Sequence, residues 1–216
     1  MNKMKGIIYD LDGVIVDTAQ YHYLGWKKLA DHIHVEFDEK KNEKLKGLSR
    51  RDSLLAMLGR VPDEEQIKKW CEMKNRFYLE FIRKLDVSVI LPGAADFLET
   101  VRKNGSWKQA LASSSRNARL ILKKLGIERF FDAVVDGTEV ERAKPDPRIF
   151  LKAALKLQLQ PDQVVVVEDA ESGIRAAQAA GMKTIGIGRP DLLSRANLVV
   201  KDLSCISLAT LEGLFR

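Results

Sequence analysis

The sequence contains very few cysteines. Only two occur among 216 residues, Cys71 and Cys205, and they lie far apart without forming a CxxC pair. Disulfide-stabilised domains and zinc sites need several cysteines at close, regular spacing. The sequence therefore predicts two reduced thiols, with neither a disulfide framework nor a zinc centre.

Long hydrophobic runs are also missing. A helix that spans a bilayer needs ~20 consecutive apolar residues, and no segment approaches that length. The first residues, MNKMKGIIYD, have a short basic lead, but Asp10 and Asp12 interrupt the apolar stretch that follows. A secretory signal would need a longer uncharged run and a cleavage site of small residues. We therefore expect a cytoplasmic protein without a membrane partner.

No part of the chain concentrates charge of one sign. The net charge is +6, but 36 basic residues are interleaved with 30 acidic ones. The chain has no dense Lys/Arg run, no zinc-finger spacing and no aromatic RNA-binding signature, which argues against a nucleic-acid partner. A small phosphorylated substrate accounts equally well for a basic surface.

Short apolar runs alternate with helical patterns over most of the chain. The runs that predict buried strands are 5–11, 109–113, 133–136, 164–168, 184–187 and 198–200. The helical patterns between them cover 95–103, 118–125, 147–157 and 171–180. Strands that alternate with helices predict an α/β fold, with a Rossmann-like, doubly wound parallel sheet covered on both faces. Ligands of such sheets bind at the carboxyl ends of the strands.

Residues 18–87 interrupt this alternation. They contain no convincing strand and show consecutive amphipathic helical patterns, the first of which includes Trp26, Leu29, Ala30 and Ile33. We therefore predict a catalytic α/β domain of residues 1–17 and 88–216, with a helical cap domain inserted at 18–87. Thr18 lies at the first expected hinge. Gly25 falls inside the first helical pattern, where it costs about 1 kcal/mol against alanine, and nothing in the sequence explains it.

The first acidic pair is Asp10-Leu11-Asp12-Gly13, directly after the first predicted strand. Two unit charges about 4 Å apart repel by roughly 4 kcal/mol at an effective dielectric constant of 20. A bound cation or a proton would remove this repulsion. Taken alone, the pair fits a solvated acidic loop equally well.

A second acidic pair, Glu168-Asp169, also follows an apolar strand. Four carboxylates at one sheet edge would reject phosphate unless Mg²⁺ and a lysine reversed the charge. Lys144, in the segment RAKPDP, is the candidate lysine, although a lysine is most often a solvated surface residue. Ser113, Ser114 and Ser115 follow the second long strand and precede a helix, an arrangement that suits both phosphate binding and helix capping.

These four segments resemble, in order and context, the four motifs of the haloacid dehalogenase superfamily of phosphotransferases. The resemblance implies that Asp10 is the nucleophile, which becomes an aspartyl-phosphate, and that Asp12 is the general acid/base. It also implies that Mg²⁺ is bound by Asp10, the backbone carbonyl of Asp12 and Asp169, with Glu168 supporting or joining them. Ser113, the amide of Ser114 and Lys144 would hold the transferring phosphate.

The predicted cap resembles that of the β-phosphoglucomutases in two segments, TAQYHYLGWKKLA and NEKLKGLSRRDSL. The resemblance implies that sugar-phosphate contacts come from His22, Lys46, Gly47, Arg50, Ser53, Lys74, Ser115 and Asn117. Without it, each cap residue would be read as an ordinary solvated or partly buried helix residue. Such an enzyme is an isomerase that converts β-D-glucose 1-phosphate to glucose 6-phosphate, with β-glucose 1,6-bisphosphate as intermediate and activator. Nothing in the sequence demands more than a monomer.

Two alternatives stay open at this point. A phosphatase of the same superfamily, acting on a sugar phosphate or phosphoglycolate, would share Asp10, Asp12, Lys144 and Asp169 and would let water hydrolyse the aspartyl-phosphate. A non-enzymatic binding module on the same scaffold is the second alternative. It would have no reason to keep two closely repelling aspartates.

Overall fold

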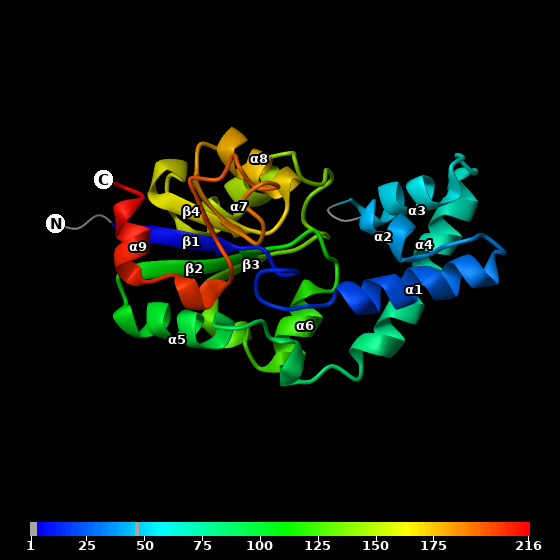
Figure 1. The fold of residues 1–216 in the computed structure, drawn as a ribbon, viewed down its shortest axis with the longest axis horizontal. Coiled ribbons are helices and arrows are strands. Elements are labelled where there is room, and N and C mark those ends of the chain that lie inside the picture. The colour runs from blue at the N-terminus through cyan, green and yellow to red at the C-terminus, as the bar shows by residue number, and fades with distance from the viewer. Residues whose placement is uncertain (1–3, 46–47) are drawn as a thin grey trace. The chain divides into compact units, whose positions relative to one another are not determined.

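The structure is a computed structural model that describes residues 4–45 and 48–216 (Figure 1). The chain divides into two compact units. One, the core unit, consists of Met1–Asp17 and Val87–Arg216, and the other, the helical unit, is the intervening segment Thr18–Asp86. The two connecting segments are hydrogen-bonded to each other within the core unit, since the amide of Asp17 donates to the carbonyl of Val89 at 2.8 Å.

A six-stranded sheet forms the centre of the core unit. Its spatial order is β3-β2-β1-β4-β5-β6, and all five strand pairs are parallel. The strands are β1 (Lys5–Tyr9), β2 (Trp107–Ala112), β3 (Ala133–Val135), β4 (Val164–Glu168), β5 (Lys183–Ile187) and β6 (Leu198–Val200). The predicted α/β fold class is therefore confirmed.

Helices cover both faces of the sheet (Figure 1). Helices α7 (Arg148–Leu157) and α8 (Glu171–Ala179) bury their apolar sides against Ile8, Ala110 and Val166. Helix α5 (Ala94–Asn104) contacts β2 and, through Phe97, the ring of Tyr9. The remaining helices of this unit are α6 (Ala118–Leu125) and α9 (Leu208–Gly213). Because both faces are covered, β4 is buried at every position, which explains its unbroken apolar run.

The helical unit contains α1 (Ala19–His32), α2 (Glu39–Glu43), α3 (Arg50–Leu58) and α4 (Glu64–Ile82). Helices α1 and α4 form its largest interhelical contact, and its buried cluster includes Trp26, Leu29 and Leu54. The first helix ends at His32, one residue before Ile33, which the apolar spacing had included.

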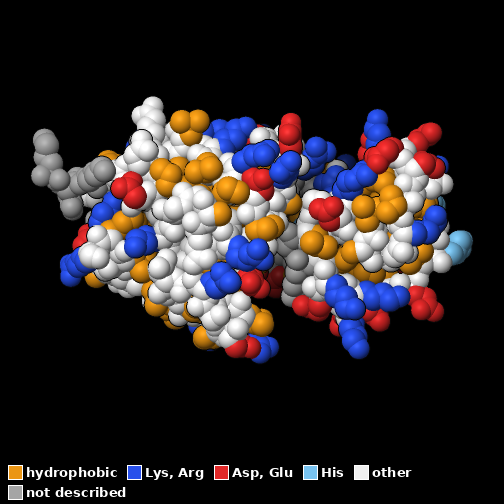
Figure 2. Space-filling view, turned by 90° about the horizontal axis from the view of Figure 1, so that it is seen from above, with side chains coloured by type: hydrophobic (Ala, Val, Ile, Leu, Met, Phe, Trp, Pro, Cys, Tyr) orange, Lys and Arg blue, Asp and Glu red, His pale blue; other side chains and the backbone are white. Residues whose placement is uncertain are grey.

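Surface charge is mixed in both units. Lys and Arg side chains are interspersed with Asp and Glu side chains over the face shown in Figure 2. No helix within the described ranges has both the length and the apolar character needed to cross a membrane.

Candidate active site

Polar residues of the core unit gather at the carboxyl edge of the sheet. Asp10 follows β1, and its amide donates to the carbonyl of Val167 in β4 at 2.9 Å. Ser113 follows β2, and its amide donates to the carbonyl of Val135 in β3 at 3.0 Å. These two backbone hydrogen bonds extend the strand pairing by one residue beyond the ends of β1 and β2. They bring Asp10 and Ser113, which are distant in sequence, to the same edge of the sheet.

Lys144 is the centre of this group. Its ammonium is buried and donates to an oxygen of Asp10, to Oε1 of Glu168 at 2.6 Å and to the carbonyl of Ala112 at 3.3 Å. Burying one cation with two carboxylates is tolerated because the hydrogen bonds offset the lost hydration. Burial alone would lower the pKa of Lys144, but the charges of Asp10 and Glu168 raise it above its usual value, so the lysine stays protonated.

Asp10 lies in a strongly charged environment. Burial raises the pKa of its carboxyl well above the usual value, Lys144 opposes this, and the charges of Glu168 and Asp12 raise it further. The carboxyl group of Asp10 is therefore buried beside a lysine, and the positive charge of that lysine stabilises its ionised form. This is the environment in which a carboxylate can accept a phosphoryl group, given enough positive charge around it.

Glu168 uses both of its carboxylate oxygens inside the protein. Oε1 accepts from Lys144, and Oε2 accepts from the amide of Ala170 at 2.9 Å. Gly173 of α8 leaves the necessary space, since a Cβ there would lie 1.9 Å from Oε1 of Glu168. In this arrangement Glu168 orients Lys144, and each of its oxygens accepts a hydrogen bond from the protein.

Asp169 packs against the loop that follows β1. A Cβ on Gly13, which has a φ of +79°, would lie 2.1 Å from Oδ2 of Asp169. The residue Asp169 is exposed to solvent. Nevertheless, desolvation by the surrounding protein atoms and the charge of Glu168 raise the pKa of its carboxyl to about 7. A cavity of about 270 Å³ opens beside it, and its lining includes Asp169, Gly13 and Arg189.

The oxygen atoms at this edge of the sheet are of the kind that binds Mg²⁺. They do not include a cluster of three acidic side chains among the described residues. Within residues 4–45 and 48–216, no three His, Cys, Asp or Glu side chains are arranged to hold a metal ion. Two carboxylates, Asp10 and Asp169, and the backbone carbonyl of Asp12 could hold one. Hard oxygen donors of this kind suit Mg²⁺, which usually keeps several waters. The raised pKa values of both carboxyls also indicate sites that a cation would relieve.

The serine loop lies between β2 and α6. The buried hydroxyl of Ser113 accepts from the amide of Ser115 at 3.1 Å, and the Ser115 hydroxyl accepts from the amide of Asn117 at 3.2 Å. A serine hydroxyl can donate as well as accept, so Ser113 could also donate to a ligand. Ser114 and Asn117 are partly buried in the same loop.

In the helical unit, the structure brings together His22, Arg50 and Lys74. Lys74 is buried, with its ammonium 3.1 Å from Nδ1 of His22 and 4.6 Å from the ring centroid of Tyr78. Burial and then the charges of Lys74 and Arg50 lower the pKa of His22 well below its usual value, so its neutral ring can accept from Lys74. Arg50 donates to Oδ1 of Asn75 at 2.9 Å.

The remaining residues expected in the cap differ in where they lie. Ser53 is buried in α3, and Thr18 is buried immediately before α1. Lys46 and Gly47 lie outside the described residues.

Sequence reasoning missed the glycines that shape the site. Gly13 and Gly173 leave space for Asp169 and Glu168, and Gly25 lets α1 approach Lys74, whose Cε would lie 3.3 Å from a Cβ at that position. At Gly25 the sequence did contain a sign of a close contact, because a glycine stands inside a predicted helix. The neighbour that required it lies 49 positions away in the sequence, between residues 25 and 74.

Comparison with known proteins gives consistent matches along the chain. Residues 7–187 match the family model of haloacid dehalogenase-like hydrolases. A β-phosphoglucomutase from Bacillus subtilis (strain 168) is 44% identical over 215 residues, which cover 97% of this chain and 94% of that protein. The crystal structure of a β-phosphoglucomutase from Clostridium difficile superposes with a TM-score of 0.92 at 37% identity, covering 99% of this chain and 97% of the other.

A phosphatase also occurs among the relatives. A phosphorylated carbohydrates phosphatase from Thermotoga maritima is 31% identical over 84% of each chain. The matches confirm the superfamily predicted from the four acidic, serine and lysine segments. The chain belongs to the haloacid dehalogenase-like hydrolase family.

Proposed function

We propose that this protein is a β-phosphoglucomutase, an isomerase that interconverts β-D-glucose 1-phosphate and glucose 6-phosphate. The observation that carries the proposal is the similarity to the B. subtilis β-phosphoglucomutase over 97% of the chain, which includes the helical unit. The helical unit supports it further, because it keeps a buried lysine beside a neutral histidine and an arginine. A buried charge of this kind is costly unless it serves a ligand or a specific pairing.

Asp10 is the proposed nucleophile. One of its oxygens attacks the phosphorus of the bisphosphate, and the bond between phosphorus and the sugar oxygen breaks. Lys144, which pairs with Asp10 here, would then contact a phosphate oxygen and neutralise part of the charge on the transferring group. Ser113 and the amide of Ser114 would donate to the other phosphate oxygens, so that transfer depends on positioning and charge neutralisation.

Asp12 is the proposed general acid/base. In the productive cycle, phospho-Asp10 gives its phosphoryl group to the 6-hydroxyl of β-glucose 1-phosphate while Asp12 takes the hydroxyl proton. The resulting β-glucose 1,6-bisphosphate reorients, and its C1 phosphoryl group passes to Asp10. Asp12 returns the proton to the departing C1 oxygen, and glucose 6-phosphate leaves. Atoms and protons balance over the cycle, and Asp10 ends phosphorylated as it began.

Mg²⁺ is the proposed cofactor, held by Asp10, Asp169 and the backbone carbonyl of Asp12. When bound, it supplies positive charge beside the transferring phosphoryl group. Glu168 is assigned to orienting Lys144, since both of its oxygens already accept hydrogen bonds.

The helical unit is the proposed cap, with Thr18 at a hinge, and it would recognise the substrate. Arg50 can bind a second phosphate with two parallel hydrogen bonds, which a mutase needs and a simple phosphatase does not. His22, Ser53 and Lys74 would contact the sugar phosphate, together with Lys46 and Gly47. Ser115 and Asn117 would contact it from the core. We further propose a cytoplasmic monomer that uses β-glucose 1,6-bisphosphate as activator.

Phosphorus NMR tests the proposal directly. The protein would receive β-glucose 1-phosphate, Mg²⁺ and a trace of β-glucose 1,6-bisphosphate. We expect the glucose 6-phosphate signal to grow with little inorganic phosphate. Growth of inorganic phosphate instead would support the phosphatase alternative, which the similarity to the T. maritima phosphatase favours. Asp10→Asn, the matched control, should abolish either reaction.

A further inference from the structure

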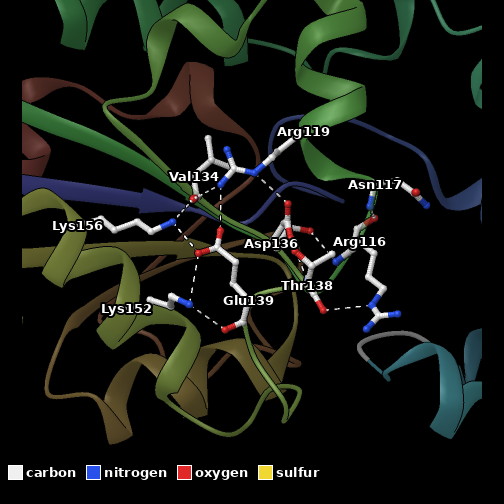
Figure 3. A network of polar contacts seen from close by, with 12 residues as sticks. Arg116, Asn117, Arg119, Val134, Asp136, Thr138, Glu139, Lys152 and Lys156 are labelled. Carbon is white, nitrogen blue, oxygen red and sulfur yellow. Dashed lines mark hydrogen bonds and ion pairs between the residues drawn. The ribbon is translucent and has the colours of Figure 1, made fainter.

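Glu139 is the centre of a charge network outside the group around Lys144 (Figure 3). Its Oε1 accepts from Arg119 at 2.9 Å, and its Oε2 accepts from Lys156 at 2.7 Å and lies 3.3 Å from the ammonium of Lys152. Burial alone would raise the pKa of Glu139, but the hydrogen bonds from Lys156 and Arg119 outweigh it and lower the pKa to about 2. The carboxylate is therefore ionised throughout the pH range in which the protein would work.

The network joins three elements of the core unit. Arg119 belongs to α6, whereas Lys152 and Lys156 belong to α7. Arg119 and Lys156 also donate to the carbonyl of Val134 in β3, at 2.7 and 2.9 Å. The ammonium of Lys152 donates to the backbone carbonyl of Glu139 at 3.0 Å. Backbone and side chain of Glu139 are thus both held by α7.

The segment held in this way, residues 136–140, is in direct contact with the serine loop. The amide of Gly137 donates to the carbonyl of Ser115 at 3.3 Å. A Cβ on Gly137 would lie 2.2 Å from the carbonyl oxygen of Ser114, so the two backbones approach as closely as a glycine permits. Asp136 is anchored as well, since its Oδ2 lies 3.1 Å from Nε of Arg119.

The same segment leads to Lys144. Only residues 140–143 separate Glu139 from this lysine, and α7 begins at Arg148 shortly beyond it. The chain that carries Lys144 is therefore held on one side by the Glu139 network and on the other by the start of α7. The serine loop follows β2 and Lys144 follows β3, and both adjoin this one anchored segment.

We propose that Glu139 is a positioning residue for phosphate binding: its carboxylate holds Arg119, Lys152 and Lys156 together and thereby sets the relative placement of the serine loop and Lys144. The proposal rests on the assignment of Ser113, Ser114 and Lys144 as phosphate-binding residues. Without the carboxylate, Lys152 and Lys156 lose their shared anion, and Arg119 keeps only its ion pair with Asp136. Of its attachments to α6 and α7, segment 136–140 would then keep the Asp136–Arg119 ion pair and the bond from Lys152 to the backbone carbonyl of Glu139, so that Gly137 is held less firmly against Ser114.

The probe for this role is beryllium trifluoride, which mimics a phosphoryl group on an aspartate, and the readout is fluorine NMR with Mg²⁺. Each fluorine signal reports the donors around one position of the phosphoryl mimic. For Glu139→Gln we expect at least one fluorine signal to move and the affinity for the mimic to fall about 10-fold, because misplaced donors weaken binding steeply. Glu99→Gln is the matched control, since Glu99 pairs with Lys103 at 3.2 Å on the solvent-exposed side of α5, and it should leave both readouts unchanged.

Rescue separates positioning from general stability. Glu139→Asp keeps the charge with a shorter side chain, and it should bind the mimic within about threefold of the parent protein. If Glu139→Gln does not fold, Arg119→Gln keeps the two lysine pairs and should still move a fluorine signal. Parent-like signals and affinity in a folded Glu139→Gln or Arg119→Gln variant would overturn the proposal. Failure of the parent protein itself to form the adduct would instead overturn the Asp10 assignment, and this inference with it.

Discussion

At the scale of single residues, Lys144 connects groups that are distant in sequence. Its ammonium contacts Asp10 after β1, Ala112 at the end of β2 and Glu168 at the end of β4. Each contact satisfies one donor of the ammonium, so its desolvation is offset by three hydrogen bonds. The arrangement keeps two buried carboxylates close to each other.

Replacing this lysine should affect both stability and turnover. In Lys144→Met, Asp10 and Glu168 would lose their shared cation, and we expect the free energy of unfolding to fall by about 3 kcal/mol. Phosphoryl transfer should slow at least ~10³-fold, because a charge that neutralises the transferring group is missing. Denaturant unfolding and the NMR time course measure the two effects. Lys103→Met, at an exposed ion pair, should change neither, and normal turnover in Lys144→Met would refute its assignment.

Gly25 acts at the same scale in the helical unit. In Gly25→Ala, the gain in helix propensity of about 1 kcal/mol competes with the new Cβ, which would lie 3.3 Å from Cε of Lys74 and 3.4 Å from Cβ of Tyr78. We expect little net change in the free energy of unfolding but a KM for the sugar phosphate raised roughly 10-fold, since the ammonium of Lys74 moves. In Gly213→Ala, where no atom lies within 4 Å of the new Cβ, KM should be unchanged. An unchanged KM in Gly25→Ala would show that Lys74 tolerates the displacement.

At the scale of elements, helix α3 shows how local sequence sets a helix end. Ser49 accepts from the amide of Asp52 at 3.1 Å and caps α3, which carries Arg50 and the buried Ser53. This Ser-x-x-Asp spacing is a helix-start signal that is visible in the sequence. By contrast, α2 was missed because none of its residues is buried, so it has no apolar stripe to recognise.

The cap of α3 can be tested by two substitutions at one position. Ser49→Ala removes the side-chain acceptor, and we expect the free energy of unfolding to fall by about 1 kcal/mol. Ser49→Asp keeps an acceptor and adds a favourable negative charge at the helix N-terminus, so most of that stability should return. Urea unfolding of both variants makes the comparison, and equal losses would show that capping does not stabilise α3.

At the scale of the whole molecule, the acidic sheet edge links stability to pH and metal. The pKa of Asp169 is raised to about 7, so the folded protein without metal binds a proton there that the unfolded chain, with its lower pKa, gives up. Between about pH 4 and pH 7, the metal-free protein should therefore lose stability as pH rises. A bound divalent cation would replace the proton and remove this loss.

Magnesium should consequently stabilise the protein more at pH 8 than at pH 5. At a concentration of 100 times its dissociation constant, it should add about 2.7 kcal/mol to the free energy of unfolding. Thermal unfolding with Mg²⁺ and with EDTA at both pH values measures this. Asp169→Asn should be insensitive to EDTA, and an equal response of the parent protein at both pH values would contradict the linkage.

Local patterns in the sequence were enough to predict the fold class, which the parallel sheet confirms, and to name the residues proposed for the core site. The β-branched strand runs, the helix periods between them and the motif residues are local patterns, since each depends on neighbours within a few positions. The interrupted alternation at 18–87 likewise predicted a separate helical segment. Strand ends were misplaced only by one or two residues, because hydrogen bonds at an element's end depend on the adjacent strand.

The contacts among these residues are visible in the three-dimensional structure alone. It showed that Lys144 pairs with both Asp10 and Glu168, and that both oxygens of Glu168 are occupied. It also showed why α1 has a glycine at position 25, and that Glu139 forms ion pairs with three basic side chains. Each of these facts is a contact between side chains on different elements. Folding sets such distances, and no periodicity or motif spacing along the chain encodes them.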